Sequence, residues 1–243
     1  MPEKRYFLDE EIQEGQKIFL EDQQVHHIVH VMRQKEGQSV ELVNGRGALA
    51  QAQLLKLEKR KVLLEVQTVQ EKKAPSFSSI LYQAIPLANR LDNIVEKASE
   101  LGVNEIRLFK SSLGEALPKS RIERLKAVAV ASMKQCGRFY LPKISLSDPI
   151  DSLKKIEETS FFGDIEAKAP SFEKTWQESP PKEACAFFIG PESGFDTKEI
   201  EKLRALGVKG VKLHDNILRT DTAAILAMGL VSQKTCFAKE QEL

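Results

Sequence analysis

The sequence predicts an α/β protein in which a small β-barrel precedes a larger domain with a mostly parallel sheet. Two patterns and the chain length support this. The first seventy residues have the pattern of short strands with little helix. From about residue 80 onward, short apolar runs alternate with segments of helical spacing, which is typical of a parallel sheet covered by helices. At 243 residues, the chain is long enough for two domains.

The predicted barrel contains two hairpins. The segment 40–43 leads into Asn44-Gly45, the favoured pair for a tight turn, and the alternating run ALAQAQL follows. The charged stretch EKRK then leads to a strand at 62–69. One short helix is expected around 25–32. Several strands with so little helix favour a barrel of a kind that often binds RNA.

The segment KKAPSFSS combines charge, proline and serine, so we place a domain boundary there, with residues 1–73 and 74–243 as the two domains. Beyond it, strands are predicted at 80–84, 105–109, 184–189 and 210–213, and helices at 91–101, 120–136, 197–206 and 221–235. The stretch between the second helix and the third strand is less regular. The last helix contains AAILAMGLV, so we expect protein to enclose it, in part from a partner subunit.

Composition narrows the classes of function. Apolar residues at 42% and charged residues at 29% are ordinary for a soluble protein. No apolar run is long enough to span a membrane and no export segment is visible, so we expect a cytoplasmic protein without a membrane partner. Cys136, Cys185 and Cys236 form no CxxC pair, which indicates reduced thiols. His26 and His30 could share a helix face, but without further ligands they predict no metal site.

A net charge of +1 conceals a basic segment. Residues 104–143 contain nine basic and three acidic side chains, a local charge of +6. Such a segment could follow a phosphate backbone, because each neutralised phosphate releases counterions. A solvated helix face explains the same charges about equally well.

Two glycine-bearing loops each follow a short apolar strand. In FFIGPESGFDTKEI, Gly190 and Gly194 permit close ligand approach, and Asp196 with Glu199 forms a capping-box pattern. The second loop, VKLHDNILRTDTAAI, leads into the last helix. Ligands in open α/β sheets lie beyond the carboxyl ends of strands, so both loops are predicted to line one pocket. The alternative is two tight turns with a structural role only.

Other motifs are absent or incomplete. No GxxxxGK[ST] loop or dinucleotide fingerprint occurs, and the serine of GPESGF stands one place too late for a nucleophile elbow, which disfavours hydrolase chemistry.

In the second loop, Thr220 or Asp221 is expected to cap the final helix.

The two loops carry a resemblance to a known family. GPESGF at 190–195 together with ILRTDTA at 217–223 resembles the paired signature of the ribosomal RNA small-subunit methyltransferase E family. EKASELGV at 96–103, KQCGRFYLP at 134–142 and HHIVHVMRQKEGQ at 26–38 are similar to its other motifs. The resemblance therefore spans nearly the whole chain in order.

The resemblance implies a PUA-like RNA-binding β-barrel followed by a SPOUT methyltransferase domain with a trefoil knot. It also implies a homodimer that uses S-adenosylmethionine to make 3-methyluridine in the 16S rRNA of the small ribosomal subunit. The residues expected to contact the cofactor are Ile189, Gly190, Pro191, Glu192, Gly194, Leu213, Ile217, Leu218 and Thr220. Those expected to contact RNA are Arg33, Arg121 and Arg138.

The chemistry suggests catalytic candidates. The imino nitrogen of uridine carries a proton that must leave before or during methylation, so a fixed cation near the base oxygens would favour the reaction. Arg219 is the candidate cation, and Asp221 orients it or caps the helix. Glu192 could act as a base, although a role in tying down its loop is the simpler explanation.

Several positions depart from the family pattern: Ser193, His214, Asn216 and Asp221 in the cofactor loops, and Leu113 and Lys134 elsewhere. These departures concern the choice of substrate more than the chemistry. Two alternatives therefore stay open: a SPOUT methyltransferase that modifies tRNA or a ribose hydroxyl, and a non-catalytic RNA-binding or ribosome-assembly factor of the same fold.

Overall fold

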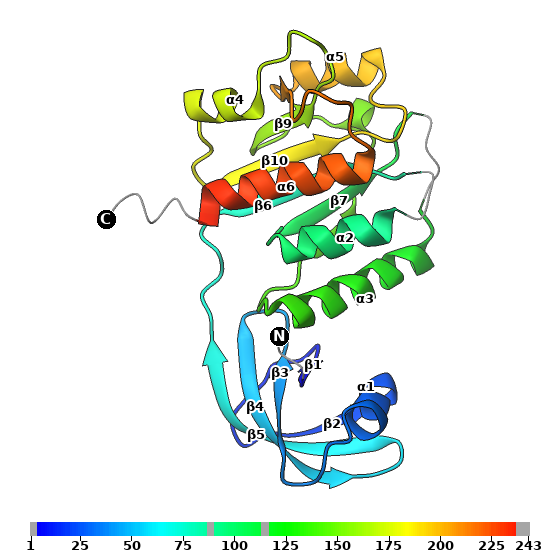
Figure 1. Ribbon diagram of the computed structural model, residues 1–243, viewed down its shortest axis with the longest axis vertical. Coiled ribbons are helices and arrows are strands. Elements are labelled where there is room, and N and C mark those ends of the chain that lie inside the picture. Colours follow the sequence, from blue (N-terminus) through cyan, green and yellow to red (C-terminus); the bar gives the residue numbers. More distant parts are fainter. Residues whose placement is uncertain (1–3, 87–89, 113–116, 237–243) are drawn as a thin grey trace, which may run out of the picture. The chain divides into compact units, whose positions relative to one another are not determined.

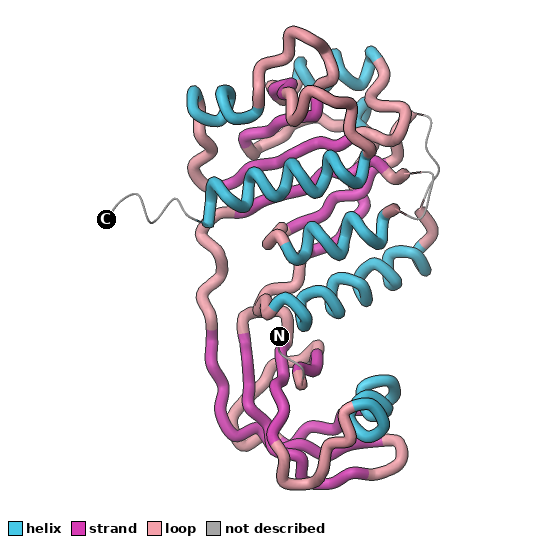
Figure 2. Tube along the Cα trace, in the orientation of Figure 1, coloured by secondary structure: helices cyan, strands magenta, loops and turns pink. Residues whose placement is uncertain are grey.

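The computed structural model describes residues 4–86, 90–112 and 117–236. Its contacts divide the chain into two compact units. The first unit comprises Met1–Ala74 and Val130–Leu141, and the second comprises Pro75–Ala129 and Pro142–Leu243. Figure 1 labels the elements, and Figure 2 separates helices, strands and loops by colour.

The first unit is built on a curled, barrel-like sheet of five strands in the order β1-β3-β4-β5-β2. Strand β1 pairs with β3 in parallel, and the other neighbours are antiparallel. The two predicted hairpins are thus confirmed as β3–β4 and β4–β5. The strands are β1 (Arg5–Phe7), β2 (Lys17–Glu21), β3 (Ser39–Val43), β4 (Ala48–Leu57) and β5 (Lys61–Glu71).

The prediction of a tight turn at Asn44-Gly45 is wrong. Four residues, 44–47, connect β3 to β4, and the Asn44 carboxamide oxygen accepts two backbone amides within the connection. The reason is that a distant part of the chain packs here: the Leu141 amide donates to the Gly45 carbonyl at 2.8 Å. A Cβ at Gly45 would lie 2.9 Å from the Leu141 Cβ, so glycine permits this close approach.

The helix predicted at 25–32 is present with a different geometry. The α-helix α1 (Asp22–His26) runs directly into a π-helical turn, η1 (His27–Val31). Ile28 of this turn is fully buried in the core of the first unit. Arg33 follows with φ of 49°, the one described non-glycine residue with a left-handed backbone.

The second unit contains a six-stranded, fully parallel sheet in the order β11-β9-β10-β6-β7-β8. The four predicted strands are confirmed. Strands β8 and β9 and helix α4 (Phe172–Glu178) occupy the stretch that showed no regular pattern. The strands are β6 (Ser78–Ala84), β7 (Glu105–Phe109), β8 (Lys143–Leu146), β9 (Thr159–Gly163), β10 (Ala184–Ile189) and β11 (Lys209–Val211).

Helices cover both faces of this sheet. Helices α2 (Leu91–Glu100) and α6 (Thr220–Cys236) pack against each other, and α6 runs across β6 and β10 (Figure 1). Helix α5 (Thr197–Ala205) and the short helix η2 (Ile150–Ser152) contribute Leu203 and Ile150 to a core with Phe162 and Phe188. Helix α3 (Lys119–Cys136) belongs partly to each unit. Among the described helices, none has the length and apolar character needed to cross a membrane.

Candidate functional site

Three loops meet at the carboxyl ends of the neighbouring strands β11, β9 and β10 and line a cavity of about 180 Å³. The first loop follows β10, the second follows β11, and the third follows β9. They meet because parallel strands that are neighbours in a sheet end at the same edge. The prediction that the two glycine-bearing loops line one pocket is confirmed, whereas the third loop was not predicted.

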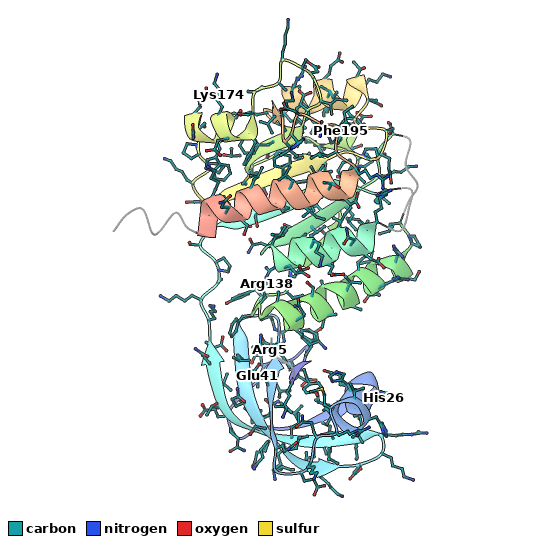
Figure 3. The ribbon with its side chains drawn as sticks, in the orientation of Figure 1. Arg5, His26, Glu41, Arg138, Lys174 and Phe195 are labelled. Atoms are coloured by element: carbon teal, nitrogen blue, oxygen red, sulfur yellow. The ribbon has the colours of Figure 1, made fainter. Side chains whose placement is uncertain are left out.

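The first loop depends on two glycines. A Cβ at Gly190 would lie 3.2 Å from the backbone nitrogen of Phe195, so no side chain fits without a shift of the loop. Gly194 has φ of 77°, and its amide donates to the Pro191 carbonyl at 3.0 Å. Phe195, labelled in Figure 3, packs against Phe109 and Phe162 and fixes the far end of the loop.

The capping box predicted for α5 is confirmed. The Asp196 carboxylate accepts the Glu199 amide at 2.8 Å, and the Glu199 carboxylate accepts the Asp196 amide at 3.0 Å. Glu199 is buried and also accepts the Ser112 amide at 3.3 Å. The hydrogen bond from the Glu199 amide is the main cause that lowers the pKa of Asp196. This cap holds the first loop at the start of α5.

Thr220 joins the second loop to the first. Its hydroxyl donates to the Gly190 carbonyl at 2.7 Å and accepts the carboxamide of the fully buried Gln83 at 3.0 Å. Asp221 accepts a hydrogen bond from Arg90 at 3.1 Å. These contacts tie the start of α6 to β6, to the first loop and to Arg90, and the cap at Thr220 or Asp221 stays a prediction.

Two departures from the family pattern support each other in the second loop. The His214 Nδ1 accepts the Asn216 amide at 3.0 Å, which closes a local turn. Lys212 pairs with Asp215 at 3.0 Å, and the hydrogen bond from this lysine lowers the pKa of Asp215. Ile217 beyond the turn is 81% exposed at the cavity. The turn therefore presents an apolar side chain to the site.

The third loop contributes Gly163, Asp164, Ile165 and Glu166 to the cavity. The Asp164 carboxylate is almost fully buried and accepts Arg204 of α5 at 3.1 Å, which fixes the loop. A signal for this loop was present: FFGD repeats the strand-then-glycine pattern of FFIG. It lies in the stretch without regular periodicity, where the pattern predicts no strand.

Eight of the nine residues named for cofactor contact line this cavity. Glu192 is outside the lining; its carboxylate lies 3.7 Å from the Arg90 guanidinium. Arg219 and Asp221 are also outside it. Arg219 is exposed, and among the described residues its guanidinium has no hydrogen-bonding or ion-paired partner. It is thus available for a ligand beyond the cavity.

The three arginines named for RNA contact differ in environment. Arg33 is exposed in the first unit. Arg121 belongs to the second unit and pairs with Asp92 at 3.0 Å, as Arg124 does at 2.6 Å. Arg138, labelled in Figure 3, is half-buried in the first unit, and burial lowers its pKa. Ion pairs therefore neutralise part of the basic segment.

The remaining candidates add little chemistry. Leu113 lies outside the described residues. Lys134 is half-buried, and burial lowers its pKa. Burial also raises the pKa of the Cys185 thiol to about 12, which makes it a poor nucleophile. Within the described part of the chain, no group of three or more His, Cys, Asp or Glu side chains is arranged for a metal ion.

Comparisons with known proteins show the class of protein to which this chain belongs. The sequence model described as an RNA methyltransferase domain matches residues 72–232, and that of an RNA methyltransferase PUA domain matches 20–67. The barrel-like unit and the parallel-sheet unit are thus the two parts of an RNA methyltransferase. The ribosomal RNA small subunit methyltransferases E of Buchnera aphidicola (subsp. Schizaphis graminum) and Bacillus subtilis are 30% and 26% identical to this chain.

These alignments cover 92% of the chain and of the Buchnera protein, and 96% of the chain and 97% of the Bacillus protein. A crystal structure of a ribosomal RNA small subunit methyltransferase E from Neisseria gonorrhoeae, bound to S-adenosylmethionine, matches with a TM-score of 0.85 and 26% identity. It covers 95% of this chain and 97% of the Neisseria chain. The chain belongs to the ribosomal RNA small subunit methyltransferase E family.

Proposed function

We propose that this protein transfers a methyl group from S-adenosylmethionine to the N3 position of a uridine in 16S rRNA. The observation that carries the proposal is the cavity built by three loops at adjacent strand ends, in a chain that belongs to this family. The Neisseria relative, bound to S-adenosylmethionine, supports the cofactor. A substrate of this kind also favours a cytoplasmic location.

The cavity fits the cofactor in its chemistry. Gly190 leaves a space beside the Phe195 backbone that any Cβ would fill, and glycine keeps backbone groups accessible to adenine. Ile189, Leu213 and Leu218 supply apolar walls for its flat faces. The residues we propose to hold the cofactor remain Ile189, Gly190, Pro191, Glu192, Gly194, Leu213, Ile217, Leu218 and Thr220.

Bound S-adenosylmethionine would supply an activated methyl group through its sulfonium charge. The chain must then favour the deprotonated form of the uridine. Arg219 is suited to this because it is an exposed cation at the end of the second loop and has no acidic partner among the described residues. Asp221 does not neutralise it, because the Asp221 carboxylate is held by Arg90. Arg219 is therefore the proposed catalytic cation.

We further propose that the protein acts as a homodimer in which α6 contributes to the interface. Ile225 and Leu226 are only partly buried within one chain, although α6 is apolar nearly all round. Ala227 is fully buried within its own unit, whereas a Cβ at Gly229 would meet nothing within 4 Å. Gly229 is thus on the open side of the helix.

Two further features follow from the family resemblance. The second loop leads from β11, at the edge of the sheet, to α6 over the central strands β6 and β10, as expected for a trefoil knot. Arg33 and Arg138 of the first unit and Arg121 of the second are the proposed RNA contacts. Their charges would attract the phosphate backbone.

The test is to incubate the protein with labelled S-adenosylmethionine and either small ribosomal subunits or tRNA. Label in the 16S rRNA, and none in tRNA, is the expected result. Transfer to tRNA alone would contradict the proposed substrate. Cofactor binding without transfer to either RNA would favour a non-catalytic RNA-binding factor.

A further inference from the structure

Arg90 contacts an acidic residue from each side of the junction between the two glycine-bearing loops. Its Nη1 lies 3.1 Å from the Asp221 carboxylate at the start of α6, and its Nε lies 3.7 Å from the Glu192 carboxylate in the first loop. Arg90 immediately precedes α2, which begins at Leu91. One cation from a third segment of the chain thus bridges the first loop and the start of α6.

The three side chains that form these ion pairs are partly shielded from water. The side chains of Arg90, Asp221 and Glu192 are 28%, 20% and 32% exposed. Charges that are mostly shielded from water are screened less than charges on an open surface. Without Arg90, the Glu192 and Asp221 carboxylates would lose the cation that both contact. This loss would favour separation of the first loop from the start of α6.

The same junction is already joined by a hydrogen bond. The Thr220 hydroxyl donates to the Gly190 carbonyl at 2.7 Å, and Thr220 and Asp221 are adjacent in the chain. Glu192 follows Gly190 by two residues. The Arg90 ion pairs are therefore a second link between the same two backbone segments, both of which border the cavity.

We propose that Arg90 is a positioning residue that clamps the first loop to the start of α6 and thereby sets the affinity for the cofactor. The inference rests on the proposed function, because S-adenosylmethionine is the ligand whose affinity is set. Arg90 does not line the cavity. Its effect therefore passes through Glu192 and Asp221, and the charge of residue 90 is what matters.

The test compares cofactor affinity in matched variants by calorimetry. Arg90→Met removes the charge and keeps an unbranched apolar side chain, so we expect binding of S-adenosylmethionine to weaken on the order of tenfold. Lys97→Met is the control: Lys97 lies on α2, the helix that follows Arg90, and pairs with Glu96 at 2.7 Å and Glu100 at 2.9 Å. It should bind the cofactor like the unaltered protein.

Two further variants separate charge from packing. Arg90→Lys should recover most of the lost affinity, and Arg90→Met combined with Asp221→Asn should bind more tightly than Arg90→Met alone. If Arg90→Met does not fold, Arg90→Gln takes its place. Unchanged affinity in the neutral variant, an equal loss in Lys97→Met, or no recovery in either further variant would overturn the clamp. An unaltered protein that binds no S-adenosylmethionine would overturn the clamp and the proposed function together.

Discussion

Replacement of Arg219 by alanine should slow methyl transfer while leaving the folded protein and its cofactor affinity nearly unchanged. The side chain is exposed and has no partner among the described residues. Its carbonyl accepts the Ala223 amide at 2.8 Å in the first turn of α6, a contact that the substitution leaves in place. A surface change of this kind alters stability by about 0.5 kcal/mol or less.

The size of the effect follows from the charge that Arg219 would stabilise. A cation about 4 Å from a developing negative charge contributes roughly 4 kcal/mol at an effective dielectric constant of about 20. Because Arg219 is exposed, we reduce this to about 3 kcal/mol, which corresponds to roughly a hundredfold in rate. Arg219→Lys keeps the charge and loses the planar fork, so we expect only partial rescue.

Calorimetry and single-turnover methylation on the same variants test this reasoning. The cofactor dissociation constant should hardly change, and the rate constant should fall about a hundredfold for Arg219→Ala. Raising the pH should help the alanine variant more than the unaltered protein, because more of the uridine is then already deprotonated. Parallel losses of thermal stability, cofactor affinity and rate would refute the catalytic assignment and make Arg219 a brace of its loop.

Three further results are expected. Gly190→Ala places a Cβ 3.2 Å from the Phe195 amide nitrogen, so calorimetry should show at least about tenfold weaker cofactor binding. Unchanged affinity would contradict the proposal that the cofactor needs the space beside Gly190. Gly229→Arg should dissociate the dimer in sedimentation while each chain stays folded, since its Cβ position meets nothing within 4 Å. Because the pKa of Asp196 is lowered in the folded protein, its cap stabilises above the ordinary Asp pKa and loses this effect as pH falls through the folded-state pKa. Asp196→Ala should therefore lower Tm near neutral pH and flatten the acid side of the Tm profile.

The elements that were predictable are those whose signals are local. The run that became β10 is short, apolar and bounded by Gly190, and the capping box of α5 is complete within four residues, Asp196 to Glu199. Periodicity and capping residues predict such elements because the relevant interactions lie within a few residues of one another. The same applies to the β4–β5 hairpin, whose strands are adjacent in sequence.

The parts that were missed depend on distant segments. Strand β9 has five residues and α4 only seven, so neither gives a long periodic signal. The place of β9 between β10 and β11, which brings Asp164 to the cavity, is a property of strand order and leaves no trace in local spacing. The partner of Asp221 is Arg90, which is 131 residues away in the chain. Local spacing could therefore suggest only a role beside Arg219, two residues earlier.

The measurement that tests the central claim most directly is the position of the methyl group on the RNA. Small ribosomal subunits that lack the modification would be treated with the protein and S-adenosylmethionine, and the 16S rRNA would be analysed by reverse transcription and by mass spectrometry of its nucleosides. A methyl group at N3 blocks the pairing edge of the base, so we predict one new stop in reverse transcription, together with 3-methyluridine in the digest. A methylated ribose, a modified base other than uridine, or no methylated nucleoside would contradict the account.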